Sequence, residues 1–113
     1  MKTVAPTPGK RVRGSGSGRA IMAAFDLLGR RGTLRILWEL RSGLPMTFRA
    51  LQSAAELPPS TLNTRLRELR ESDLVDSEDG YRLSDQGRQL LPALEPLQTW
   101  AGGWSKHLAK VNR

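Results

Sequence analysis

The order of apolar and turn-forming residues between Thr47 and Leu83 constrains the fold of this chain most strongly. The stretch reads as a short helix, a turn marked by Pro58 and Pro59, a second helix, and a two-stranded hairpin. In the second helix, leucines recur at helical spacing and form one narrow apolar stripe, made of Leu62, Leu66 and Leu69. This helix should therefore pack on a core along one face and leave its opposite face free.

The opposite face of the second helix is small, polar and mostly cationic. The side chains that project away from the stripe are Ser60, Thr64, Arg67 and Glu71, with Asn63 and Arg70 on one flank. Such a face suits a DNA groove, because small hydroxyls allow close approach, Asn offers a donor and an acceptor, and Arg can bridge two acceptors on guanine or grip a phosphate. Similar faces also occur on solvent-exposed helices that bind no partner.

The length and composition favour one compact domain with a polyanionic partner. The chain has 113 residues, of which 38% are apolar, and its 18 Lys and Arg against 11 Asp and Glu leave a net charge of +7. This charge fits nucleic acid or an acidic membrane surface, although solubility alone would also explain it. The longest purely apolar run, residues 20–25, is too short to span a bilayer. We therefore expect a soluble protein without membrane contact. The sequence has no cysteine for disulfides or thiol redox chemistry, which fits the reducing cytoplasm.

The amino-terminal residues 1–18 are rich in Pro, Gly, Ser and basic residues, and we expect them to form a disordered basic arm ahead of a domain over residues 19–113. Counted to Arg19, which closes the arm, five cations account for +5 of the +7 net charge, namely Lys2, Lys10, Arg11, Arg13 and Arg19. This arm could track phosphates or enter a minor groove, or it could be an unselected flexible end.

Two helices are expected before Thr47. The apolar residues of Ala20 to Leu28 are spread around too much of a helix for one core to cover, which indicates a partner surface. We expect Thr33 to cap a central buried helix that contains Trp38 in the core and that ends at Gly43. The segment after it, residues 44–46, suits at most a short edge strand because of its proline.

Local signals place further boundaries. Thr47 is expected to cap the next helix, with Phe48, Leu51 and Ala54 facing the core, and Pro59 fits the first position of the second helix. The hairpin should start at Leu74 and Val75, turn through Asp79-Gly80 in a type I′ turn, and return over residues 81–83.

The carboxyl-terminal region carries the seam of a helix that packs on another helix. We expect Ser84 to cap it. Its apolar residues recur in steps of three and four: Leu90, Leu94, Leu97, Ala101, Trp104, Leu108 and Val111. Pro92 and Pro96 should kink the region or divide it into two pieces. The seam could pack on a second copy of the chain or on the first helix of the same chain.

Four segments together resemble a winged helix-turn-helix transcriptional regulator of the HxlR type, a relative of the MarR regulators. They are ILWEL at 36–40, TFRAL at 47–51, STLNTRLRELRESDLV at 60–75 and YRLSDQGRQLLPAL at 81–94. The resemblance implies a mainly α fold with a small β-hairpin wing. It also implies a dimeric DNA-binding repressor or activator whose dimer is made by the first and last helices.

The resemblance also implies residue roles. By position, the groove-facing residues would be Ser60, Thr61, Asn63, Thr64 and Arg67, to which we add Arg70 and Arg82 as DNA-binding candidates. Arg65 would lie beside the core. The dimer interface would contain Ile21, Phe25, Leu97, Trp100, Trp104 and Leu108.

Two features depart from the family pattern. Gly32 stands where the family usually has a Trp before its central helix, which should leave the start of that helix less anchored. The hairpin carries Asp76, Glu78 and Asp79 with only Arg82 in opposition, so its tip should be repelled by phosphates.

Enzymatic chemistry lacks support in the sequence. The single histidine, His107, has no second imidazole or thiol, and no Gly-rich phosphate loop follows a strand. Glu68 and Glu71 are better explained by ion pairs with neighbouring Arg residues than by acid–base work. We therefore expect neither an enzyme nor a metal or cofactor site.

The expected function is that of a homodimeric, sequence-specific regulator, with repression the simpler output, on a near-palindromic operator in double-stranded DNA. A winged helix that serves only as a protein-interaction module is the alternative. A dimer cleft could also admit a small apolar or aromatic effector.

Overall fold

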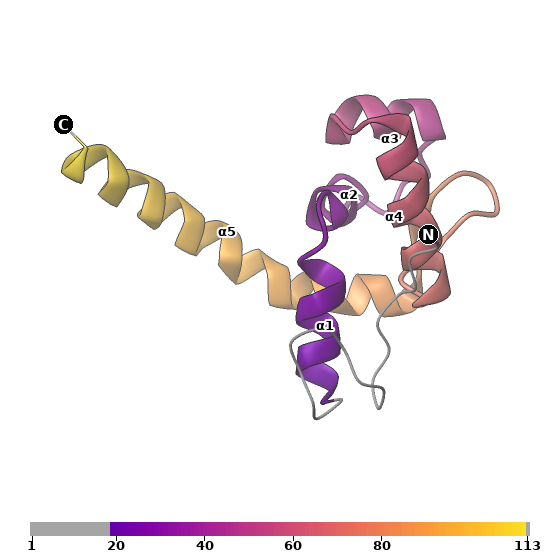
Figure 1. Ribbon diagram of the computed structural model, residues 1–113, viewed down its shortest axis with the longest axis horizontal. Coiled ribbons are helices and arrows are strands. Elements are labelled where there is room, and N and C mark those ends of the chain that lie inside the picture. The colour runs from indigo at the N-terminus through magenta and orange to yellow at the C-terminus, as the bar shows by residue number, and fades with distance from the viewer. Residues whose placement is uncertain (1–18, 113) are drawn as a thin grey trace.

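A computed structural model describes residues 19–112 of the chain; residues 1–18, which contain most of the expected basic arm, and residue 113 lie outside the described residues. The elements follow in the order α1 (Ala20–Leu28), α2 (Thr33–Glu39), α3 (Phe48–Ala55), α4 (Pro59–Glu71), β1 (Val75–Asp76), β2 (Arg82–Leu83) and α5 (Asp85–Val111). In Figure 1, α2, α3 and α4 cluster together, whereas α5 starts beside this cluster and then projects away from it. The expected fold, mainly α with a small β-hairpin wing, is confirmed.

The core lies between α2, α3, α4 and the two short strands. Eleven buried residues form one cluster: Ile36, Leu37, Leu40, Leu51, Ala55, Leu57, Leu62, Leu66, Leu69, Val75 and Leu83. The apolar stripe expected on α4 is therefore confirmed. On α3, Leu51 is buried as expected, but Ala54 is exposed and Ala55 takes its place, since the buried face of α3 repeats at four-residue spacing.

Three of the expected helix starts are confirmed. Thr47 Oγ1 accepts a hydrogen bond from the Ala50 amide at 3.1 Å, and Ser84 Oγ accepts one from the Gly87 amide at 3.0 Å. Pro59 is the first residue of α4.

The expectation for α2 is wrong at both ends. Its N-cap is Gly32, with φ 87°, and Thr33 is the first helical residue, without a capping side chain. The left-handed backbone favours glycine here, and a Cβ at this position would lie 2.8 Å from Leu57 Cδ1, so a larger residue would also have to displace that side chain. The helix also ends at Glu39, four residues before Gly43.

The hairpin is antiparallel, with Val75 opposite Leu83 and Asp76 opposite Arg82. Its link spans residues 77–81, and only Gly80 in this link has a positive φ, of 98°. A type I′ turn requires positive φ at both central residues, so the expected Asp79-Gly80 turn is wrong. The expected edge strand before Thr47 is a single bridge, in which Met46 and Tyr81 exchange backbone hydrogen bonds of 2.9 and 2.8 Å.

The expected division of the last helical region is also wrong, because α5 is one helix of 27 residues. Pro92 and Pro96 lie inside this helix, exposed and one turn apart, and the helix continues through both. The first turn of α5 is held tightly to the hairpin, since a Cβ on buried Gly87 would lie 2.2 Å from the Leu74 carbonyl oxygen. Among residues 19–112, none of the helices has both the length and the apolarity that a bilayer crossing needs.

Candidate nucleic-acid interface

The polar face of α4 is presented to solvent because the opposite face holds the buried leucines. Asn63 and Arg70 are exposed, and Thr64 and Arg67 are half-buried. Ser60 and Thr61 lie in the first turn, exposed and half-buried respectively. The structure therefore brings six of the seven DNA-binding candidates onto one helix, although their contact with DNA stays a prediction.

The first turn of α4 is open to an anion. The N-cap residue is Pro58, whose ring offers no acceptor, and no side-chain cap hydrogen bond forms at this end. The amides of a helix's first turn bind phosphate readily when no side chain occupies them. Ser60 and Thr61 thus combine short hydroxyls with a helix end that suits a phosphate.

Arg67 is held only loosely by its neighbours. Its Nε lies 3.9 Å from Glu71 Oε1, which exceeds hydrogen-bond distance, and both side chains are about two-fifths exposed (39% and 41%). Among the residues that the structure describes, this buried Nε has no hydrogen-bond partner. The guanidinium group can therefore turn towards another acceptor without breaking a strong bond.

The hairpin brings acidic groups to the carboxyl end of α4. A shallow hollow of about 420 Å³ lies there, lined by Arg67, Arg70, Glu71, Asp73, Val75, Asp76 and Ser77. Arg82, the seventh candidate, lies on β2 opposite Asp76 and is half-buried, so it does not join the α4 group. Asp76, at the end of β1, and Glu78 and Asp79, within the link of the hairpin, are all exposed, as the sequence indicated.

The inward side of α4 carries a buried carboxylate, that of Glu68. Its Oε1 accepts a hydrogen bond of 2.6 Å from Arg65 Nη1, which confirms the expected local ion pair. Its Oε2 also pairs with Arg30 from the α1–α2 link, a partner that sequence reasoning missed. The two residues are 38 positions apart, so no local spacing could have indicated this contact.

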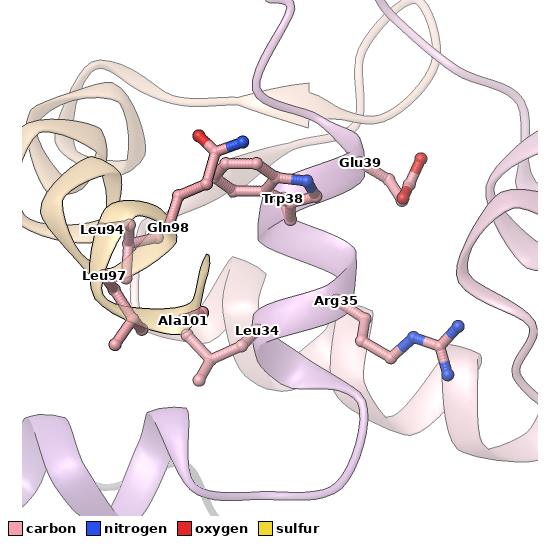
Figure 2. A pocket seen from close by; sticks show the side chains of 8 residues that line it. All are labelled: Leu34, Arg35, Trp38, Glu39, Leu94, Leu97, Gln98 and Ala101. Atoms are coloured by element: carbon pink, nitrogen blue, oxygen red, sulfur yellow. The ribbon is translucent and has the colours of Figure 1, made fainter. Parts of the chain in front are cut away.

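An apolar groove of about 460 Å³ lies between α2 and α5. Figure 2 shows Leu94, Leu97 and Ala101 of α5 facing Leu34 and Trp38 of α2, while Arg35 and Glu39 point away from α5. Trp38 is half-buried, so its expected place in the core is wrong. It forms a wall of this groove, and the Arg41 guanidinium lies 4.2 Å from its ring centre.

The candidate dimer residues lie on α1 and α5, and most are exposed. Ile21 is 51% and Phe25 60% exposed on α1, whereas Ala23 and Leu27 are buried. On α5, Leu97, Trp100 and Trp104 are each at least half exposed, Leu108 is half-buried, and the two indoles stack with centroids 5.3 Å apart. Large apolar side chains thus remain uncovered on both helices.

Within residues 19–112, the structure contains no group of three His, Cys, Asp or Glu residues that could hold a metal ion.

The fold agrees with comparisons with known proteins. Residues 33–78 match the family described as a helix-turn-helix domain. The chain is 28% identical over 91 residues to an uncharacterised HTH-type transcriptional regulator of Methanocaldococcus jannaschii, with 75% of this chain and 85% of that protein covered. It is 38% identical over 91 residues to another such regulator, from Mycobacterium tuberculosis strain H37Rv, with 74% of this chain covered. The match spans 57% of the length of that mycobacterial relative.

A solved structure shows the same architecture. The quinone-bound YodB from B. subtilis superposes with a TM-score of 0.68 at 28% sequence identity, covering 74% of this chain and 96% of that chain. The chain therefore has the winged helix-turn-helix fold and is similar to HTH-type transcriptional regulators.

Proposed function

We propose that this chain is a sequence-specific, DNA-binding transcriptional regulator of the HxlR type that acts as a homodimer, with repression as its output. The observation that supports the proposal most is that α4, which lies within the residues matched by the helix-turn-helix family, has one apolar and one polar face. Its leucines are buried, while Ser60, Asn63 and Arg70 are exposed and Thr61, Thr64 and Arg67 are half-buried on the opposite side. A regulator seated on a promoter blocks polymerase by occupancy alone, which is why repression is the simpler output.

In this proposal α4 enters the major groove. Asn63 and Arg67 contact base edges, because their side chains can each make two hydrogen bonds to one base. Ser60, Thr61 and the first-turn amides contact a phosphate, and Thr64 packs closely on the groove. Arg70 and Arg82 contact phosphates at the margin, where the carboxylates around Asp76 limit how closely the wing approaches.

The homodimer forms through α1 and α5. The exposed Ile21 and Phe25 of α1 and the exposed Leu97, Trp100 and Trp104 of α5 support this assembly, with Leu108 at the end of the same seam. Gly102 and Gly103 have open space beside them, so a partner helix can approach the α5 backbone. Two copies of α4 would then enter successive major grooves about 34 Å apart on a near-palindromic operator.

The domain organisation follows the charge of the sequence. We assign residues 19–113 to the DNA-binding and dimerisation domain and residues 1–18 to a basic arm that neutralises phosphates. The arm then adds affinity for any DNA sequence, whereas α4 selects among sequences.

The groove between α2 and α5 offers room for a small effector. Its wall is mainly apolar, with the indole of Trp38 on one side and Leu94 and Leu97 on the other, which suits an aromatic molecule. The related YodB is described as quinone-bound. Because this chain has no cysteine, such a ligand would be held without a thiol adduct.

A gel-shift experiment tests the proposed function. Labelled fragments of random genomic DNA are mixed with the full chain, and the shifted fragments are challenged with a large excess of unlabelled competitor DNA. We expect a subset of fragments to stay bound, because base contacts resist competition that phosphate contacts do not. A protein-interaction module would leave no fragment bound selectively, and this result would refute the proposal.

A further inference from the structure

The buried carboxylate of Glu68 lies on α4, the recognition helix of the proposed function, but faces away from the side proposed to contact DNA. Its side chain is 1% exposed, and the whole residue is fully buried. A buried carboxylate is costly unless it is paired and hydrogen-bonded. Its position in α4 therefore depends on the groups that pair with it.

Those groups tie α4 to the junction of α1 and α2. Arg65, three residues before Glu68 on the same helix, bonds Oε1 at 2.6 Å and also donates from Nε to the Arg31 carbonyl oxygen at 2.9 Å. Arg30 pairs with Oε2, and its Nη2 lies 3.7 Å from Asp26 Oδ2 on α1. A continuous line of polar contacts thus runs from α1 through residues 30 and 31 to the middle of α4.

The geometry points to Glu68 as a positioning residue for DNA recognition, which, together with Arg30 and Arg65, locks the rotation and tilt of α4 relative to α1. This inference rests on the proposed function. The apolar stripe of α4 determines which face of the helix packs on the core, but apolar contacts have little directional preference and resist small rotations of the helix only weakly. Charge-assisted hydrogen bonds in a buried site are directional and can fix that rotation.

The connection reaches the proposed dimer surface. Asp26 lies in the last turn of α1, the helix that exposes Ile21 and Phe25, and Arg30 lies in the link just after it. In a homodimer, the orientation of α1 would be set by the partner copy, and the Glu68 contacts would transmit that orientation to α4. The angle between the two recognition helices, and hence the fit to both half-sites, would depend on this carboxylate.

A second ion pair between distant segments differs from this one in burial. Arg35 Nη2 and Glu56 Oε2 are 2.9 Å apart, but their side chains are 55% and 77% exposed. Exposed pairs of this kind contribute little and are screened by salt. This pair provides a matched control, because Arg35→Gln removes the same charge by the same chemical change as Arg30→Gln.

The first measurement uses fluorescence anisotropy with the full chain at a temperature where circular dichroism shows every variant folded. The probes are the best duplex that the unmodified chain selects from a random library and a shuffled duplex of the same composition. For Arg30→Gln we expect the ratio of the two affinities to fall by about tenfold, whereas Arg35→Gln should change it less than about twofold. Arg30→Lys keeps the charge and should recover part of the ratio, and it carries the test if Arg30→Gln does not fold.

The second measurement needs no DNA. Amide hydrogen exchange should become faster in α4 and in residues 30–33 together for Arg30→Gln, and should stay unchanged there for Arg35→Gln.

Failure of the unmodified chain to select any duplex in the first measurement would refute the proposed function and, with it, the role of Glu68 in recognition. An unchanged affinity ratio in folded Arg30→Gln, or an equal loss on both duplexes, would refute the positioning role while leaving the proposed function intact.

Discussion

At the scale of single residues, Thr33 is a polar residue whose hydroxyl group is buried without a hydrogen bond among residues 19–112. The residue is 1% exposed, and its Oγ1 has no hydrogen-bond partner among residues 19–112. The sequence suggested that this hydroxyl caps α2, but Gly32 occupies the N-cap position with a left-handed backbone. A buried hydroxyl without a partner keeps its desolvation cost.

Replacing this hydroxyl with a methyl group should therefore stabilise the protein. We expect Thr33→Val to raise the free energy of unfolding by about 1 kcal/mol, measured by thermal melting or urea titration. The matched control is Thr47→Val, which removes an N-cap bond to the Ala50 amide and should cost about 1 kcal/mol. If Thr33→Val lowered stability as Thr47→Val does, the hydroxyl of Thr33 would be bonded after all.

At the scale of elements, patterns of local origin were predictable. The existence of α4, its stripe of Leu62, Leu66 and Leu69, and the caps at Thr47 and Ser84 follow from spacing within one turn or one helix. These features depend on neighbours in sequence, so periodicity and side-chain chemistry are sufficient to place them.

The features that could not be predicted depend on contacts between distant segments. Gly32 takes the N-cap position of α2 with a left-handed backbone packed against Leu57, and the buried Glu68 pairs with Arg30 from the α1–α2 link. The helix α5 continues through Pro92 and Pro96, both exposed, although proline usually breaks or kinks a helix. For the candidate site, the sequence placed residues on α4 but gave no information on what orients the helix.

The exposed half of α5 carries a prediction about assembly. Trp104 is 51% exposed and stacks on Trp100, so an aspartate at this position should leave a single chain folded but introduce an unpaired charge into the proposed helix interface. Analytical ultracentrifugation should show Trp104→Asp as a monomer at concentrations where the unmodified chain is a dimer.

The matched control for this change is Ser105→Asp, at the next position of the same helix, where an exposed polar residue is replaced. This variant should sediment as a dimer. A monomeric unmodified chain at micromolar concentration, or a dimeric Trp104→Asp variant, would contradict the proposed interface.

At the scale of the whole molecule, positive charge is concentrated at one end of the sequence. Residues 1–18 contain four cations and no acid, so +4 of the net charge of +7 lies outside residues 19–113, the proposed DNA-binding domain. The acidic residues around the wing reduce the charge of the fold further. Affinity for DNA in general and selection of a sequence should therefore be separable.

Deleting residues 1–18 should weaken binding to all DNA by a similar factor and leave the preferred operator unchanged. Each phosphate that the arm no longer neutralises should reduce the slope of log affinity against log salt by about 0.9. Anisotropy titrations at several salt concentrations measure the slope, and a full-length control with Lys2, Lys10, Arg11 and Arg13 changed to Gln should behave like the deletion.

Two results would contradict this division of roles. An unchanged salt slope would show that the arm does not bind phosphates. A changed operator preference would show that the arm itself reads groove width or bases.

The claim that α4 reads bases is central to the proposed function, and one titration tests it most directly. The affinities of Arg67→Ala and Asn63→Ala for the duplex that the unmodified chain selects are compared with their affinities for a shuffled duplex, with Arg70→Ala as the phosphate-binding control. We predict that Arg67→Ala and Asn63→Ala each lose about 1–3 kcal/mol on the selected duplex and much less on the shuffled one, while Arg70→Ala loses equally on both. Equal losses on both duplexes for Arg67→Ala and Asn63→Ala would contradict the claim, because these side chains would then bind phosphates and not bases.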